Sequence, residues 1–184
     1  GDAFETRVSF EGIPENALRH AVAYMEDVIN TTPFGYKHLI VLARVHVALN
    51  ELYEALALTG RALKIRRDDI DALLLRTKTY YRLAEHDTAL NHVRECLKTD
   101  PDNVKCKDVY KRIRKLNKLY TKGNEAFEEQ NYEDAVRMYQ ESIDVDPEHV
   151  RHAKTCFAKQ TQAYMKLTSY DNARETAQKT LSID

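Results

Sequence analysis

The stretch that decides the fold is LNKLYTKGNEAFEEQNYEDAVRMYQESIDVDPEH, residues 116–149. It contains a glycine at Gly123, an alanine at Ala135 and a proline at Pro147, with apolar residues at helical spacing between them. Small residues let two helices approach closely, and proline cannot continue a helix. The stretch therefore predicts a pair of antiparallel helices that contact each other through small residues and end at a turn.

The same pattern recurs along the chain. Five alanines, each in the middle of an expected helix, follow one another at spacings of 34, 34, 46 and 38 residues: Ala21, Ala55, Ala89, Ala135 and Ala173. Twelve residues after the first four alanines, where a helix is expected to have ended, come Pro33, Arg67, Pro101 and Pro147. The repeated units are 2–35 (atypical), 36–69, 70–103, 116–149 and 154–184 (truncated).

A period of 34 residues is typical of tetratricopeptide repeats (TPRs). The sequence thus predicts an all-α TPR superhelical solenoid of about five antiparallel helix pairs, which must stack because one pair cannot bury its own apolar face. We expect two sub-stacks, residues 1–103 and 116–184. Residues 104–115 are extra to the period and contain neither Gly nor Pro, so they predict a helical extension and one long helix over 104–129.

Composition argues against several classes of function. The 28 basic and 29 acidic residues give a formal net charge of -1, whereas a general nucleic-acid-binding protein needs a positive excess. No apolar run is long enough to cross a membrane, and no Gly-rich phosphate loop, nucleophile elbow or paired zinc-ligand spacing occurs. We therefore expect no enzymatic activity, no cofactor and no metal, and we interpret His149 and His152 as surface histidines. The abrupt ends, with Gly1 resembling a cloning remnant, indicate a piece of a larger protein.

One basic run lies in the expected long helix: Lys111, Arg112, Arg114, Lys115 and Lys118. Such a run is either a contact for an acidic partner or nucleic acid, or a solvated helix face. Acidic residues balance the charge elsewhere in the chain, so we favour the solvated face.

The inner, concave face of a TPR array is lined by the first helix of each pair and is where these arrays usually hold partners. Projecting the repeat onto the sequence predicts an apolar stripe with polar neighbours, which suits an extended and partly hydrophobic peptide. The alternative is that these residues pack beneath neighbouring helices. The predicted groove residues are Ile40, Arg44, Val47, Leu74, Lys78, Tyr81, Tyr120, Asn124, Phe127 and Met165, with Ala158 and Gln162 beside them.

A specific form of this groove is the Lys/Asn clamp with which some TPR domains grip the acidic C-terminal tails of cytosolic heat-shock chaperones. Asn124 matches one clamp position, but Tyr120 occupies the preceding lysine position and Lys159 the next asparagine position. We therefore do not expect the tail-clamp function.

Two of the three cysteines, Cys96 and Cys106, flank the expected turn at Pro101, and the third is Cys156. The turn folds two helices against each other, an arrangement compatible with Cα atoms within about 7 Å, the reach of a disulfide. A disulfide indicates an oxidising compartment and two buried thiols a reducing one. The residues alone leave both open.

The stretches VRECLK at 93–98 and YKRIRKLNKL at 110–119 resemble the middle of the DnaJ/TPR co-chaperones of the ER lumen. These are the DnaJ homologs of subfamily C first described as inhibitors of the interferon-induced, RNA-activated protein kinase. The resemblance is clear from about residue 73 to residue 141 and includes the long inter-repeat helix. Members of the family have nine TPRs in three sub-stacks, followed by a J-domain.

The resemblance implies a segment that binds unfolded client proteins and works with the lumenal heat-shock ATPase chaperone in the unfolded protein response. It also implies stress-activated kinases of translation initiation factor two as partners, a disulfide between Cys96 and Cys106, and a location in the ER lumen. The His-Pro-Asp motif of a J-domain is absent from the sequence, so the ATPase is expected to be contacted outside this chain.

Two alternatives place the chain in the cytoplasm. One is a cytosolic DnaJ protein with a TPR array of the same period, but it carries the clamp lysine and asparagine that Tyr120 and Lys159 replace here. The other is a TPR adaptor or assembly scaffold without a chaperone role.

Overall fold

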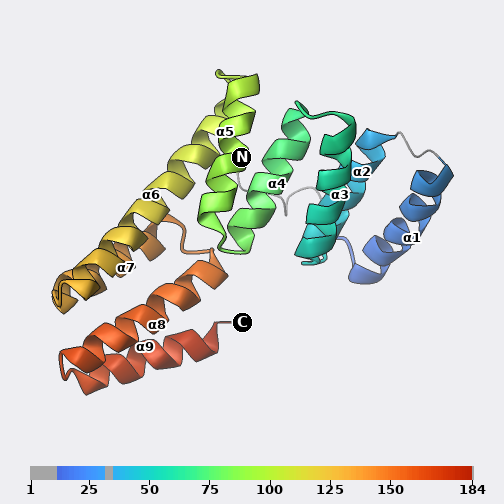
Figure 1. The fold of residues 1–184 in the computed structure, drawn as a ribbon. Coiled ribbons are helices and arrows are strands. Elements are labelled where there is room, and N and C mark those ends of the chain that lie inside the picture. Colours follow the sequence, from blue (N-terminus) through green and yellow to red (C-terminus); the bar gives the residue numbers. More distant parts are fainter. Residues whose placement is uncertain (1–11, 32–34, 184) are drawn as a thin grey trace. The chain divides into compact units, whose positions relative to one another are not determined.

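The computed structural model describes residues 12–31 and 35–183, and every regular element in this part of the chain is an α-helix (Figure 1). The predicted first helix of unit 2–35 and the turn at Pro33 lie outside the described residues. The helices are α1 (Glu15–Thr31), α2 (Tyr36–Ala48), α3 (Leu52–Ile65), α4 (Ile70–Arg82), α5 (His86–Thr99), α6 (Val104–Glu128), α7 (Tyr132–Val145), α8 (Val150–Lys166) and α9 (Tyr170–Ser182).

The chain divides into two compact units, residues 1–110 and 111–184. In the first unit α2 pairs with α3, α4 pairs with α5, and the pairs stack through α3 and α4, while α1 packs on α2. The repeat alanines Ala55 and Ala89 are completely buried, as expected of residues at which two helices approach closely. The predicted all-α solenoid of helix pairs is confirmed.

In the second unit α7 packs on α8 and α8 on α9. Gly123 of α6 faces Tyr139 of α7, and a Cβ atom added at Gly123 would lie 2.7 Å from Cε1 of the tyrosine ring. Tyr139 is itself completely buried, so the glycine is required for this pair of helices to close.

The long helix predicted over 104–129 is α6, which runs unbroken over Val104–Glu128, and residues 104–115 form its first part. Helix α8 begins at Val150, four residues before the expected start of unit 154–184. Those four residues account for the spacing of 38 rather than 34 between the last two alanines. The assignment of two sub-stacks, 1–103 and 116–184, stays a prediction.

Each of the four turns inside a described helix pair contains one residue with a left-handed backbone. It always lies five positions before the repeat alanine. These residues have φ between 57° and 62° and none is glycine: Asn50, Ala84, Gln130 and Thr168. In each turn the N–H of the following residue donates to the carbonyl five residues earlier, at 2.8–3.0 Å. This is the Schellman arrangement, which satisfies the last free carbonyls of the first helix.

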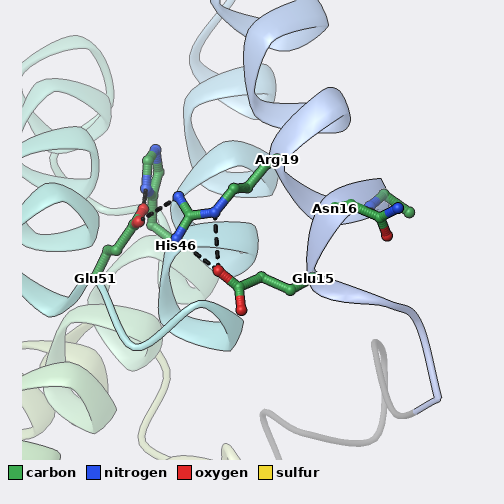
Figure 2. A network of polar contacts seen from close by, with 6 residues as sticks. Glu15, Asn16, Arg19, His46 and Glu51 are labelled. Carbon is green, nitrogen blue, oxygen red and sulfur yellow. Dashed lines mark hydrogen bonds and ion pairs between the residues drawn. The ribbon is translucent and has the colours of Figure 1, made fainter.

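A polar network connects α1 to the corner between α2 and α3 (Figure 2). Glu51, the residue before α3, accepts from His46 Nδ1 at 2.7 Å and from Arg19 Nη1 at 3.1 Å. Arg19 also contacts Glu15 at 2.7 Å. The hydrogen bond from His46, followed by the one from Arg19, lowers the pKa of Glu51.

Candidate protein-binding site

In the first unit the predicted inner face belongs to α2 and α4, and its apolar members are inside the core. Ile40, Val47, Leu74 and Tyr81 are each at most 8% exposed. Ile40 and Val47 belong to the cluster that packs α2 against its neighbours. These four side chains therefore offer a partner almost no surface as the helices stand.

The charged members of the same face remain accessible. Arg44 is exposed, and its Nη2 lies 3.7 Å from Asp71 Oδ1 on the next pair. Lys78 is partly exposed. Arg82, which the sequence analysis did not single out, donates from Nη1 to the Val47 carbonyl at 2.8 Å and so lies over the C-terminal end of α2. What the first unit presents here is polar and basic.

The second unit keeps aromatic groups accessible on its predicted inner face. Tyr120, Asn124 and Phe127 of α6 are all partly exposed. The hydroxyl of Tyr139 donates to Asn124 Oδ1 at 2.9 Å, and burial raises the pKa of Tyr139, so this donor stays protonated. The amide of Asn124 is thereby held in one orientation.

Helix α8 completes this face. Lys159 Nζ lies 5.9 Å from the centre of the Phe127 ring, and the Tyr120 ring is 5.6 Å from that of His152. Ala158 and Gln162 are exposed, and Met165 is 52% exposed although it is apolar. We call the surface formed by Tyr120, Asn124, Phe127, Lys159 and Met165 the aromatic face.

His149 and His152 are not surface histidines, contrary to the interpretation of the sequence. They are 6% and 1% exposed, and their rings are 5.6 Å apart. His152 Nε2 lies 2.9 Å from Ser142 Oγ and 3.2 Å from Cys156 Sγ. The sequence missed this contact because α7 and α8 must pair before the three side chains meet.

A cysteine and a serine beside a histidine resemble a nucleophile with its base, yet the environment suppresses that chemistry. Burial raises the pKa of Cys156 to about 12, so its thiol stays protonated at neutral pH. The Ser142 hydroxyl donates to the Leu116 carbonyl at 2.9 Å. The side chains of Ser142 and Cys156 are both completely buried. The contacts bind α6, α7 and α8 together.

Cys96 of α5 and Cys106 of α6 are joined in a disulfide, with Cα atoms 6.4 Å apart. Both are completely buried. Asn103 Oδ1 accepts from the Cys106 N–H at 3.1 Å, which fixes the start of α6 beside the bond.

Within residues 12–31 and 35–183, no group of three or more His, Cys, Asp or Glu side chains is arranged to hold a metal ion. No helix in the same ranges combines the length and the apolar character needed to cross a membrane.

Comparison with known proteins agrees with the architecture. The tetratricopeptide-repeat family profile matches residues 119–149. The solved structure of the P58(IPK) TPR domain superposes with a TM-score of 0.83, at 22% identity, over 96% of this chain and 48% of that one. The chain is a TPR solenoid.

Two curated relatives of this TPR solenoid are DnaJ homologs. A DnaJ homolog subfamily C member 7 homolog of Schizosaccharomyces pombe is 28% identical over 155 residues, 84% of this chain and 33% of the relative. DnaJ homolog subfamily C member 3 of Homo sapiens is 28% identical over 127 residues, 69% of this chain and 25% of the relative. The resemblance to DnaJ/TPR proteins is confirmed, and the chain spans a third or less of the length of these two relatives.

Proposed function

We propose that this TPR segment is the protein-holding part of a DnaJ-type co-chaperone, and that it binds non-native clients or partner proteins on the aromatic face. The observation that carries the proposal is the exposure of Met165 on α8 together with the partial exposure of Tyr120 and Phe127 on α6. Unfolded chains offer apolar side chains and free backbone groups, and Met adapts its shape to varied partners. Asn124 and Lys159 supply polar contacts at the edge of the same surface.

In the first unit, Arg44 and Lys78 remain proposed contacts for polar parts of a partner. Ile40, Val47, Leu74 and Tyr81 stay predicted groove residues, but a partner reaches them only after neighbouring side chains move.

The test measures suppression of aggregation of chemically denatured rhodanese by light scattering, with the chain at several-fold molar excess. We expect suppression by the wild-type chain and weaker suppression by Met165→Glu, which places a charge on the aromatic face. Leu181→Glu is the matched control, because Leu181 is an exposed apolar residue of α9 outside this face. No suppression by the wild-type chain would contradict client holding and leave the scaffold alternative.

We also propose that the chain works in the ER lumen with the heat-shock ATPase there, and with the stress-activated kinases named by the resemblance as further partners. The buried Cys96–Cys106 disulfide supports an oxidising compartment. Mass spectrometry under non-reducing conditions, on protein recovered from its native compartment, tests the location. Two free thiols at these positions would favour the cytoplasmic alternative.

A further inference from the structure

A second groove lies on the second unit, between α6 and α7, with a volume of about 360 Å³. Lysines 115, 118 and 122 of α6 line it from one helix, and Glu141 and Asp144 of α7 line it from the other. Each helix also contributes one partly buried apolar residue, Leu119 and Val145. At 3.6 residues per turn, the lysines lie on the side of α6 opposite Tyr120, Asn124 and Phe127.

The lysines belong to a longer row. Lys111, Lys115, Lys118 and Lys122 follow one another at spacings of 4, 3 and 4 residues and are all exposed, so they form one stripe on α6. The stripe is about 16 Å long, at about 1.5 Å per residue. We call these four residues the lysine stripe.

The lysine stripe has no partner inside the described ranges 12–31 and 35–183, where no carboxylate lies within 4.0 Å of its ammonium groups. Like charges three and four residues apart on a helix destabilise it. The row therefore costs stability that no ion pair within the described residues offsets. Such a cost is offset when an anionic group from another molecule binds.

Leu119 indicates that the occupant is apolar as well as charged. It lies sixteen residues before its repeat alanine, the position held by Leu39 and Leu73 in the first unit. Leu39 and Leu73 are 1% and 5% exposed beneath neighbouring helices, whereas Leu119 is only partly buried. Leu119 therefore keeps surface that a partner can contact, unlike its two equivalents in the first unit.

We propose that this groove binds an amphipathic helix of a partner protein. Acidic residues of that helix face the lysine stripe, apolar residues contact Leu119 and Val145, and basic residues face Glu141 and Asp144. Charge complementarity on both sides selects this occupant, because a uniform polyanion such as RNA would be repelled by the two carboxylates. Because the groove and the aromatic face lie on opposite sides of α6, the proposal does not depend on client binding.

Fluorescence anisotropy tests this with the whole chain and a labelled 18-residue helical peptide that carries Glu along one edge, Leu along the centre and Lys along the other edge. We expect saturable binding that weakens at least about tenfold when Lys115, Lys118 and Lys122 are all changed to Glu, since close charge pairs across an interface are worth this much or more. The matched control changes Lys37, Lys64 and Lys105 to Glu. These lysines are exposed and lie outside the groove, and the control alters net charge equally. We expect it to weaken binding less than about twofold.

Circular dichroism establishes that the charge-reversed chain is folded, and Lys118→Ala provides a milder change expected to weaken binding in the same direction. Equal binding of a scrambled peptide, equal losses in the two triple variants, or tighter binding of single-stranded oligouridine would each overturn the proposal. Met165→Glu is expected to bind the peptide normally. A chain that fails to suppress aggregation but binds the peptide therefore contradicts only the proposed function.

Discussion

Gly123 sits against the ring of Tyr139, where no side chain larger than hydrogen fits without a shift of the two helices. We expect Gly123→Ala to lower the free energy of unfolding by about 1–3 kcal/mol, the usual cost of overpacking. This loss should appear even though alanine favours a helix by about 1 kcal/mol over glycine. Urea denaturation followed by circular dichroism measures it.

The control for this substitution is Gly60→Ala in α3. There the added Cβ meets only the tip of the long Arg76 side chain, with Nη1 at 3.2 Å. A smaller loss than at Gly123 is expected because a guanidinium can move more easily than a buried ring. Equal losses would mean that the Tyr139 contact is not the cause.

Glu51 gives the first unit a predictable response to acid. Its pKa is lowered in the folded chain, mainly by the hydrogen bond from His46 and then by that from Arg19. A carboxyl with a lowered pKa stabilises the fold at every pH above its pKa in the unfolded chain, which is near 4.5. This stabilisation is lost as the pH falls through the pKa of the carboxyl in the folded chain. We expect Glu51→Gln to reduce the loss of stability between about pH 5 and pH 3. Glu54→Gln, at an exposed residue in the first turn of α3, is the charge-matched control, and an equal reduction in that variant would contradict the role of Glu51.

At the scale of elements, the four left-handed turn residues are expected to differ in the free-energy cost of their backbone conformation. A left-handed conformation costs a side chain about 1–2 kcal/mol, least for Asn and most for a β-branched residue. We expect Thr168→Gly to raise the free energy of unfolding by about 0.5–1 kcal/mol, Ala84→Gly by less, and Asn50→Gly least. Thr155→Gly, inside α8, should lower it. Thermal denaturation of the four variants tests the order, and a loss at Thr168 would contradict it.

The disulfide between α5 and α6 closes a loop of 10 residues. Closing a loop of this size in the unfolded chain stabilises the fold by about 3 kcal/mol in the chain-entropy description. Reduction should therefore lower the urea midpoint of the wild-type chain. The double variant Cys96→Ala, Cys106→Ala should start from a lower midpoint and show no further change with reductant. A midpoint that ignores reductant in the wild-type chain would mean that the bond adds no stability.

The sequence sufficed to predict the helix pairs and α6, because close packing imposes small residues such as Ala55 and Ala89 at a fixed period. The turns gave no such signal, since Asn50, Ala84, Gln130 and Thr168 share a conformation but no chemistry. The groove prediction could place Ile40 and Tyr120 in equivalent positions, yet not their exposure. That depends on which neighbouring helix covers each residue, and in the first unit Arg82 lies over the C-terminal end of α2.

At the scale of the whole chain, the described terminal helices are the least buried. Helices α1 and α9 each contain two buried residues, whereas α2 contains seven. Opening a helix with few buried contacts costs little free energy, so its amides exchange first. We expect hydrogen exchange read by mass spectrometry to show α1 and α9 losing protection well before α2. Simultaneous exchange of all three would indicate a single cooperative unit instead.

The packing of each helix mainly on its neighbours in sequence also bears on how the chain is made. A pair needs no residue from far downstream, so the earlier pairs can close while later ones are still being translated. Cys96 and Cys106 leave the ribosome within about two seconds of each other, at about 5–20 residues per second. Their sulfurs can therefore meet before Cys156, which follows much later in the sequence, leaves the ribosome to compete for the bond.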